Sequence, residues 1–234
     1  MQLYQVAMQI KWSSPDRWTH VIVCPGGMHT IMSFIGCIGT LMCNSGLEEL
    51  LSTAFKGITH MMTEKAWPKA FCGLRMVAEA VLEPFVLAGN VTVSAFENML
   101  ECARQSRTGR LWIDSLIISV SILLLFVRAE IEGDWLLHMY CLQRMIPYFF
   151  AAGHWNYARY IQWHVVDMSH DLPHEILQFF LRGDHVCRHG QGTWNSVFMD
   201  QFGEQTYVVL LGKHFLKNKW QNGPFLINYA TVYH

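Results

Sequence analysis

The clearest pattern of hydrophobic positions near the start of the chain is a β-branched run that leads directly into glycines. The run THVIVC at residues 19–24 is followed by Pro25, Gly26 and Gly27. This order is typical of a buried strand that ends in a tight turn. The next segment, Met28–Met42, is apolar on nearly all sides, which predicts a buried helix. Strand, turn and helix in this order predict a small α/β unit.

Helical spacing dominates the middle of the chain, where strand signals disappear. Ser45 is the expected N-cap of a helix over 47–55. Pro84 is expected to break the chain after a helix, and Pro147 to end or kink the helix that contains it. Apolar residues recur at helical intervals in further segments: Ile58–Thr63, Pro68–Leu82, Ser94–Arg104, Leu111–Ile131, Trp135–Phe150, Asn156–Met168 and His174–Leu181. These segments predict a helical bundle.

The pattern changes again from residue 185 onward. Thr206–Leu211 fits either an extended helix or a strand, and Phe225–Val232 suits a late strand. The chain is therefore predicted to be mainly α with a small α/β part. Its expected organisation is an α/β segment over 1–45, a helical bundle over 46–184 and a C-terminal segment over 185–234.

Composition indicates a globular protein whose surface carries few charges. Hydrophobic residues make up 52% of the chain and charged residues 15%, against about 25% in typical proteins. So small a charged surface favours a protein partner, a homo-oligomer or a missing piece of the same fold. The net charge of −1 excludes a strong global field for nucleic acid or for anionic membranes.

Cysteine usage and the first residues predict an intracellular location. Seven cysteines stand at irregular spacings, many of them within apolar runs. Such usage favours reduced, buried thiols over a disulfide framework. The opening residues MQLYQ contain no basic segment followed by an apolar one, so no secretory signal is expected.

One apolar run raises the alternative of a single-pass membrane protein. Leu111–Val127 reads LWIDSLIISVSILLLFV, and Asp114 interrupts it. A membrane span needs roughly 20 apolar residues. Because this run is shorter and is flanked by Arg110 and Arg128, a buried central helix is the preferred interpretation, and membrane insertion is not expected.

Two carboxylates close to the C-terminus form the leading candidate site. Asp200 and Glu204 lie four residues apart in WNSVFMDQFGEQT, so on a helix they share one face. Two anions so placed repel each other unless a cation, an arginine or a shared proton lies between them. A divalent metal is therefore the candidate ligand, and a solvated helix face is the alternative.

His29 is the second candidate, because it stands at the predicted strand–helix junction, where α/β sheets place their sites. It could orient a phosphate or a metal-bound water, and local capping or packing is the alternative. Farther along, His185, Cys187 and His189 alternate, with His164, His170 and His174 upstream. Structural zinc sites usually have paired ligands at both ends, and a second pair that contains cysteine is missing here. The chain contains neither a GxSxG nucleophile motif nor a glycine-rich phosphate loop.

Four ordered segments resemble a multicopy animal protein family of unknown function that is associated with transposable elements. The similarity covers about residues 3–213, and family members are much longer, so the chain looks like a C-terminal fragment of such a protein. The segments that carry the resemblance are HVIVCPGGMHTIMSFIGCIGTLM, CNSGLEELL, FVRAEIEGDWLLHMYCLQRMIPYFFAAGHWNYARY and VCRHGQGTWNSVFMDQFGEQT.

The resemblance implies a relation to DNA transposases, which have a ribonuclease-H-like core that helices interrupt. Such cores use three carboxylates to hold two divalent metals for phosphoryl transfer. On this template, 1–45 and 185–234 form an incomplete ribonuclease-H-like core, and 46–184 is a helical insertion. Glu204 would be the last carboxylate. The first strands should supply the other acids, yet Asp16 is the only acid before Glu48.

This shortage of acids predicts a transposon-derived fragment without catalytic activity, whose remaining role is protein interaction. The alternative is a nuclear, Mg²⁺- or Mn²⁺-dependent nuclease or DNA strand-transferase. It would use Glu204 and Asp200 as catalytic and metal-binding residues, with His29 assisting. DNA is an expected partner only under this alternative, and no other cofactor is expected.

Overall fold

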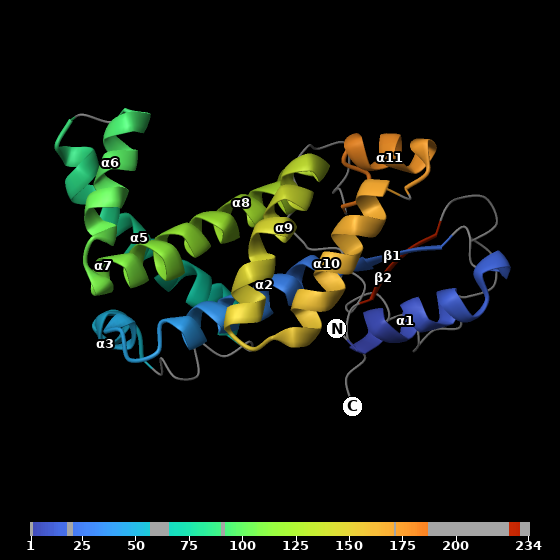
Figure 1. The fold of residues 1–234 in the computed structure, drawn as a ribbon, viewed down its shortest axis with the longest axis horizontal. Helices are drawn as coiled ribbons and strands as arrows, with labels where there is room; N and C mark the ends of the chain where they lie inside the picture. The colour runs from blue at the N-terminus through green and yellow to red at the C-terminus, as the bar shows by residue number, and fades with distance from the viewer. Residues whose placement is uncertain are drawn as a thin grey trace. The chain divides into compact units, whose positions relative to one another are not determined.

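The computed structural model describes residues 2–17, 21–56, 66–89, 92–170, 172–186 and 225–229, and it is mainly helical (Figure 1). This confirms the predicted mainly α fold class. The chain divides into two compact units. Unit 1 comprises Met1–Thr30, Leu125–Ile146 and Trp155–His234, and unit 2 comprises Ile31–Leu124 and Pro147–His154. The division into segments 1–45, 46–184 and 185–234 stays a prediction.

A two-stranded parallel sheet joins distant parts of the sequence in unit 1 (Figure 1). Strand β1 (Val21–Pro25) pairs with β2 (Phe225–Tyr229), with Val21 opposite Phe225 and Pro25 opposite Tyr229. Strand β1 overlaps the predicted strand and extends one residue past it, to Pro25, whereas β2 lies within the predicted segment 225–232. A parallel pair requires a long crossover connection between its strands, and here nearly the whole chain separates the two.

Helix α1 (Gln2–Ser13) packs on β1 in unit 1. Its side chains Tyr4, Ala7 and Met8 form a buried cluster with Val23 of the strand, and Tyr160 packs against this cluster. The spacing of 4, 7 and 8 places these residues on one helical face. A short 3₁₀ turn follows at Pro15–Arg17, so Asp16 lies in an exposed turn, as predicted.

Helix α2 (Gly27–Leu41) follows β1 after the glycine turn, which confirms the predicted strand–turn–helix order. The next helix, α3 (Leu47–Ser52), begins differently from the prediction. Its N-cap is Gly46, whose φ of 90° is left-handed, a conformation that glycine adopts at no steric cost. Ser45 therefore lies one residue before the cap. Its hydroxyl donates to the carbonyl of Met42 at 2.6 Å, and its oxygen accepts from the N–H of Leu47 at 3.4 Å.

The predicted helices of the middle segment are present wherever the structure describes the chain. They are α5 (Trp67–Leu87), α6 (Val93–Arg104), α7 (Arg107–Leu111), a π-helix η3 (Trp112–Ile117), α8 (Ile118–Glu132), α9 (Trp135–Ala151), α10 (Trp155–His170) and α11 (His174–Leu181). The predicted segments 58–63 and 206–211 lie outside the described residues.

Two prolines stand inside helices that continue past them, so the predicted chain break at Pro84 and the predicted helix end at Pro147 are wrong. The kink that was the other expectation at Pro147 stays a prediction. A proline removes one intrahelical hydrogen bond, but packing on both sides can hold the helix together. Around Pro147, the side chains of Met145 and Phe149 are fully buried. In unit 2 the ring of Phe149 also meets the edge of Phe34 at 5.7 Å between centroids.

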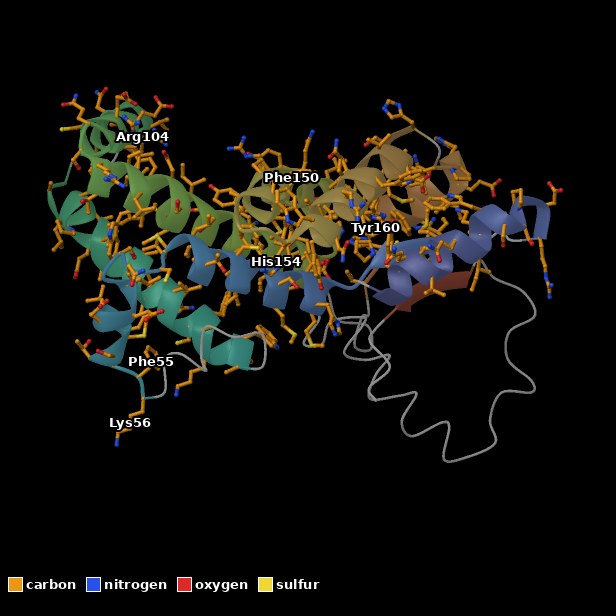
Figure 2. All side chains as sticks on the ribbon, turned by 60° about the horizontal axis from the view of Figure 1, so that its bottom comes forward. Phe55, Lys56, Arg104, Phe150, His154 and Tyr160 are labelled. Atoms are coloured by element: carbon orange, nitrogen blue, oxygen red, sulfur yellow. The ribbon has the colours of Figure 1, made fainter. Side chains whose placement is uncertain are left out.

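The π-helix η3 lies within the long apolar run, and one of its carbonyl groups accepts a hydrogen bond from a side chain of another helix. A π-turn shifts the hydrogen-bonding pattern by one residue. In unit 2 the hydroxyl of Tyr148 donates to the carbonyl of Asp114 at 2.8 Å. The Asp114 carboxylate pairs with Nε of Arg104 at 2.8 Å (Figure 2 labels Arg104). The charge that interrupts the apolar run is thus neutralised by a neighbouring helix.

By length and composition alone, the continuous helical stretch Arg107–Glu132 is long and apolar enough to cross a membrane, with a mean hydropathy of 2.0 over its most apolar window. A core helix passes the same test, and 44% of this window is buried. Its fully buried side chains include Leu116, Leu123 and Phe126, as in the core helix of a bundle. The membrane-spanning alternative for 111–127 stays a prediction.

Candidate functional site

The turn between β1 and α2 brings a buried carboxylate against the first residue of a helix. The carbonyl of Gly26 accepts hydrogen bonds from both the backbone N–H (3.0 Å) and the hydroxyl (2.8 Å) of Thr30, which fixes the first turn of α2. A Cβ atom placed on Gly27 would collide with Oε2 of Glu130. A side chain at residue 27 would therefore have to displace the Glu130 carboxylate, which occupies this space.

Glu130 is paired with a histidine inside unit 1. Its Oε1 lies 2.6 Å from Nδ1 of His138, and each side chain exposes only about 6–7% of its surface. The imidazole stacks on Trp135 at 5.3 Å between centroids, with an interplanar angle of 12°, and Phe126 lies 5.1 Å away. His185 meets the same ring edge-on at 5.7 Å. We call Glu130 and His138 the Glu–His pair.

The α8–α9 turn sets the geometry of the Glu–His pair. Gly133 ends α8 with a φ of 71°, and Asp134 caps α9 by accepting from the N–H of Leu137 at 3.0 Å. This tight turn lets residues on the two helices face each other, so that Glu130 and His138 meet although eight residues separate them. The pair belongs to the same unit as β1 and α11.

A second group of buried polar side chains lies beside β1. His164 is fully buried, and its ring meets Tyr4 edge-on at 6.3 Å. No hydrogen-bond partner among the described residues reaches the Tyr4 hydroxyl or either ring nitrogen of His164. Burial lowers the pKa of His164 to about 3, the charge of a protonated His138 lowers it further, and the Val23 backbone opposes the shift. This imidazole is therefore neutral at physiological pH.

The thiol and phenol of this group are held in their neutral forms. Burial raises the pKa of Cys24 to about 12, and the negative charges of Glu130 and Asp167 add to the shift. Burial likewise raises the pKa of Tyr4, helped by Cys24 and Asp167. Because a thiolate and not a thiol is the nucleophile, Cys24 is poorly suited to nucleophilic catalysis.

The cysteines differ sharply in exposure, and this predicts their reactivity. Cys43, Cys72 and Cys102 are exposed, whereas Cys24 and Cys141 are buried, with the pKa of each raised to about 12, chiefly by burial. At pH 8 we expect iodoacetamide to modify Cys102 at least about 100-fold faster than Cys24, because the thiolate fraction sets the rate. Peptide mapping of timed samples measures this.

Labelling in urea is the control, because unfolding should bring all these thiols to similar rates. Equal rates for Cys24 and Cys102 in the native protein would contradict the burial of Cys24.

Of the site residues that the sequence predicts, the structure describes His29 but not Asp200 or Glu204. His29 lies in the first turn of α2 and is half-buried, and its carbonyl accepts from the hydroxyl of Tyr157 at 3.4 Å. Asp200 and Glu204 lie outside the described residues, so their meeting with His29 stays a prediction. Within the described ranges, no group of three or more His, Cys, Asp or Glu side chains could hold a metal ion.

The predicted histidine–cysteine cluster is likewise only partly described. His185 is buried, with Nδ1 3.2 Å from the carbonyl of Phe180 and its ring 5.1 Å from Trp135. Cys187 and His189 lie outside the described residues. His185 thus contributes to the packing around the Glu–His pair, a role that spacing along the sequence does not indicate.

An exposed aromatic surface on unit 1 is the feature that the sequence analysis missed. Helix α10 carries two opposite faces: Ala158, Ile161, His164 and Met168 are buried, while the outward side exposes large side chains. Trp155 is 59% exposed, Trp163 48% and Val166 53%. We define the tryptophan face as the outward side chains of α10 together with one from α1: Trp12, Trp155, Arg159, Gln162, Trp163 and Val166.

The two helices meet within this face. Trp12 of α1, itself 46% exposed, lies 4.6 Å from Trp163 between ring centroids. An open hollow is lined by Arg159, Gln162, Trp163 and Val166. The guanidinium of Arg159 donates to Oδ1 of Asn156 at 2.9 Å and lies 5.8 Å from the ring centre of Tyr160 (Figure 2 labels Tyr160). The spacing 155, 159, 163, 166 is the sequence signal that predicts such a stripe.

Comparison with known proteins gives a family match. A family model described as a domain of unknown function, DUF8702, matches residues 1–90 and 85–211. No curated protein matches the chain. No solved structure matches it either.

Proposed function

Since the chain belongs to the DUF8702 family, whose function is unknown, we propose a function from its residues: it is a transposon-derived protein without catalytic activity that acts inside the cell through protein–protein contact. The observation that carries this proposal is the tryptophan face. Large exposed apolar surfaces bounded by polar residues mark interaction sites on soluble proteins.

The composition of this face supports a protein partner. Tryptophan and arginine are among the residues most enriched at the energetic centres of protein interfaces. Here Arg159 and Trp163 line an open hollow, and Trp12 lies 4.6 Å from Trp163 between ring centroids. A single exposed apolar residue would not indicate an interface, because single exposed apolar residues are normal on any protein surface. Three tryptophans that are 46–59% exposed on neighbouring helices are unusual and do indicate one.

The state of the buried carboxylate supports the absence of catalysis. Glu130 is the acid that lies beside the β1–α2 turn, where a ribonuclease-H-like site would be sought. Its carboxylate is buried, bonded to His138 and covered by Gly27. Metal-dependent phosphoryl transfer needs several carboxylates that converge on an open site. The Glu130 carboxylate does not meet this need, because it is buried and already paired with His138.

We also propose that unit 1 contains part of a ribonuclease-H-like core. The parallel pairing of β1 with β2, and the glycine turn from β1 into α2, support this proposal. The long helical stretch between the two strands is what an insertion into such a core requires.

The alternative function is a divalent-metal-dependent nuclease or DNA strand-transferase. The position of His29, in the first turn of the helix that follows β1, favours it. Glu204 and Asp200 would bind Mg²⁺ or Mn²⁺, and the site would be complete only if further acids joined them. Under this alternative the partner is DNA and the location is nuclear.

A nicking assay separates the two functions. We expect purified protein with supercoiled plasmid and Mn²⁺ or Mg²⁺ to give no more nicked product than the matched variants Glu204→Gln and Asp200→Asn. The physical reason is the shortage of converging acids. Metal-dependent nicking by the wild type that both variants abolish would refute the non-catalytic proposal and establish the nuclease.

A further inference from the structure

We infer that the tryptophan face binds a proline-rich segment of another protein in the extended polyproline II conformation. This inference rests on the proposed interaction function and names the class of its partner. Its basis is the chemistry of the face, which offers aromatic rings and hydrogen-bond donors. The described side chains that line its hollow include no carboxylate.

The polar side chains of the hollow are chiefly hydrogen-bond donors. Arg159 and the indole of Trp163 can only donate, and Gln162 carries both a donor and an acceptor. Trp12 adds a second indole beside Trp163. The complementary ligand is rich in acceptors and poor in donors. A proline-rich segment has this character, because proline lacks a backbone N–H and the polyproline II helix leaves its carbonyl groups without internal hydrogen bonds.

Arg159 is held in place and keeps donors for a ligand. One terminal nitrogen of its guanidinium donates to Oδ1 of Asn156 at 2.9 Å, and the guanidinium lies 5.8 Å from the ring centre of Tyr160. Both contacts are made with uncharged groups, so neither neutralises the positive charge. Because a guanidinium has five N–H donors, several remain for the carbonyl groups of a bound segment.

The two indoles supply an apolar platform that is already assembled. Trp12 and Trp163 lie 4.6 Å apart between ring centroids with an interplanar angle of 47°, and each is about half exposed. Surfaces lined by aromatic rings are the recurring docking sites of proline-rich segments. Because the contact between the indoles restricts both rings before binding, little side-chain entropy is lost on binding.

The length of the face sets the size of the ligand. From Trp155 to Val166 the outward side of α10 extends about 16 Å, which about five residues of a polyproline II helix also span. Single-stranded nucleic acid stacks on aromatic rings too, but it needs a positively charged groove, and Arg159 is the only basic member of the tryptophan face. So short a contact predicts a weak complex, with a dissociation constant on the order of 100 µM.

Nuclear magnetic resonance of the indole N–H signals in protein with isotope-labelled tryptophan tests the inference. Titration of the full chain with decaproline up to about 2 mM should shift the signals of Trp12 and Trp163 until they saturate. The signal of Trp135, which is buried in the core, should not move. A Gly-Ser peptide of the same length is the control ligand and should give no saturable shift.

Variants locate the binding surface. Trp163→Ser, followed through Trp12, should weaken decaproline binding at least about 10-fold, because it removes half of the platform. Leu136→Ser is the matched control, since Leu136 is 67% exposed on α9, outside the tryptophan face, and should leave binding unchanged. Circular dichroism checks that each variant is folded. If Trp163→Ser does not fold, Arg159→Met decides.

Arg159→Met keeps an unbranched apolar side chain but removes the donors, so it should weaken binding at least about 3-fold. Added salt separates the proline-rich ligand from nucleic acid. Decaproline has no charged side chains, so its affinity should change less than about 2-fold between low and high salt. Binding of a ten-residue oligothymidylate would instead fall steeply with salt.

Four results would overturn the inference: no saturable shift with decaproline, equal affinity for the Gly-Ser peptide, an affinity that folded Trp163→Ser or Arg159→Met leaves unchanged, or tighter binding of the oligothymidylate. None of these results bears on nicking of plasmid, so the non-catalytic proposal is judged separately by the nicking assay.

Discussion

On acidification from pH 6.5 to pH 3, the wild-type protein is expected to lose about 4 kcal/mol more unfolding free energy than His164→Phe. The folded-state pKa of His164 is about 3, against 6.5 for the free side chain. Between these values the unfolded chain binds a proton that the folded chain excludes, so stability falls as the pH falls. A difference of one in pKa between the folded and unfolded states corresponds to about 1.4 kcal/mol.

The sign of this effect defines the pH window. Above pH 6.5 the imidazole is neutral in both states and contributes no pH dependence. Below pH 3 it is protonated in both, so the loss is complete. Phenylalanine keeps the edge-on contact with Tyr4 but cannot take up a proton, so it removes this contribution while the carboxylates still titrate.

Urea denaturation at half-unit pH steps measures the difference between the two proteins. His170→Asn is the matched control, because His170 lies on the same helix but is exposed, and its loss should leave the slope unchanged. Parallel pH profiles for the wild type and His164→Phe would show that His164 is not buried in the neutral form.

The second large effect is expected at the glycine beside the Glu–His pair. Gly27→Ala should lower the unfolding free energy by about 3 kcal/mol, because the new methyl group displaces a buried, hydrogen-bonded carboxylate. Gly36→Ala is the matched control on the same helix. A Cβ at residue 36 would meet only Cε1 of His154, at an ordinary 3.7 Å, so we expect little change or a small gain.

A double-mutant cycle identifies the cause of the Gly27 effect. Glu130→Ala alone should destabilise the protein by about 3–5 kcal/mol, because it leaves His138 buried without its acceptor. In the Glu130→Ala background, the additional effect of Gly27→Ala should fall below about 1 kcal/mol, since the obstructing carboxylate is gone. If the two losses simply add, then residue 27 and the carboxylate do not compete for the same space.

The strand–turn–helix unit was predictable from sequence because its signals are local. β-branched residues, two glycines and a continuous apolar helix follow each other without a gap, and β1 and α2 lie where they are expected. Helix α1 was missed because its apolar residues lie on two opposite sides. Tyr4 and Met8 are buried, whereas Val6 and Ile10 are each 48% exposed, and this arrangement blurs the helical period.

The candidate site was less predictable because its contacts are not local. The sequence directs attention to Asp200 and Glu204, which form a pattern by themselves. Glu130 and His138 have no such pattern, since their pairing depends on the turn at Gly133 and on the approach of Gly27 from another element. Similarly, Pro147 predicts a helix end by its own chemistry, and the packing of the buried side chains Met145 and Phe149 overrides it.

The pairing of Val21 with Phe225 has a consequence for folding during synthesis on the ribosome. At about 5–20 residues per second, β1 leaves the ribosome roughly 10–40 s before β2 is made. Throughout that interval the edge of β1 that pairs with β2 lacks this partner strand. Folding of unit 1 is therefore a late event that nascent-chain chaperones must await, whereas Ile31–Leu124 can begin to condense while synthesis continues.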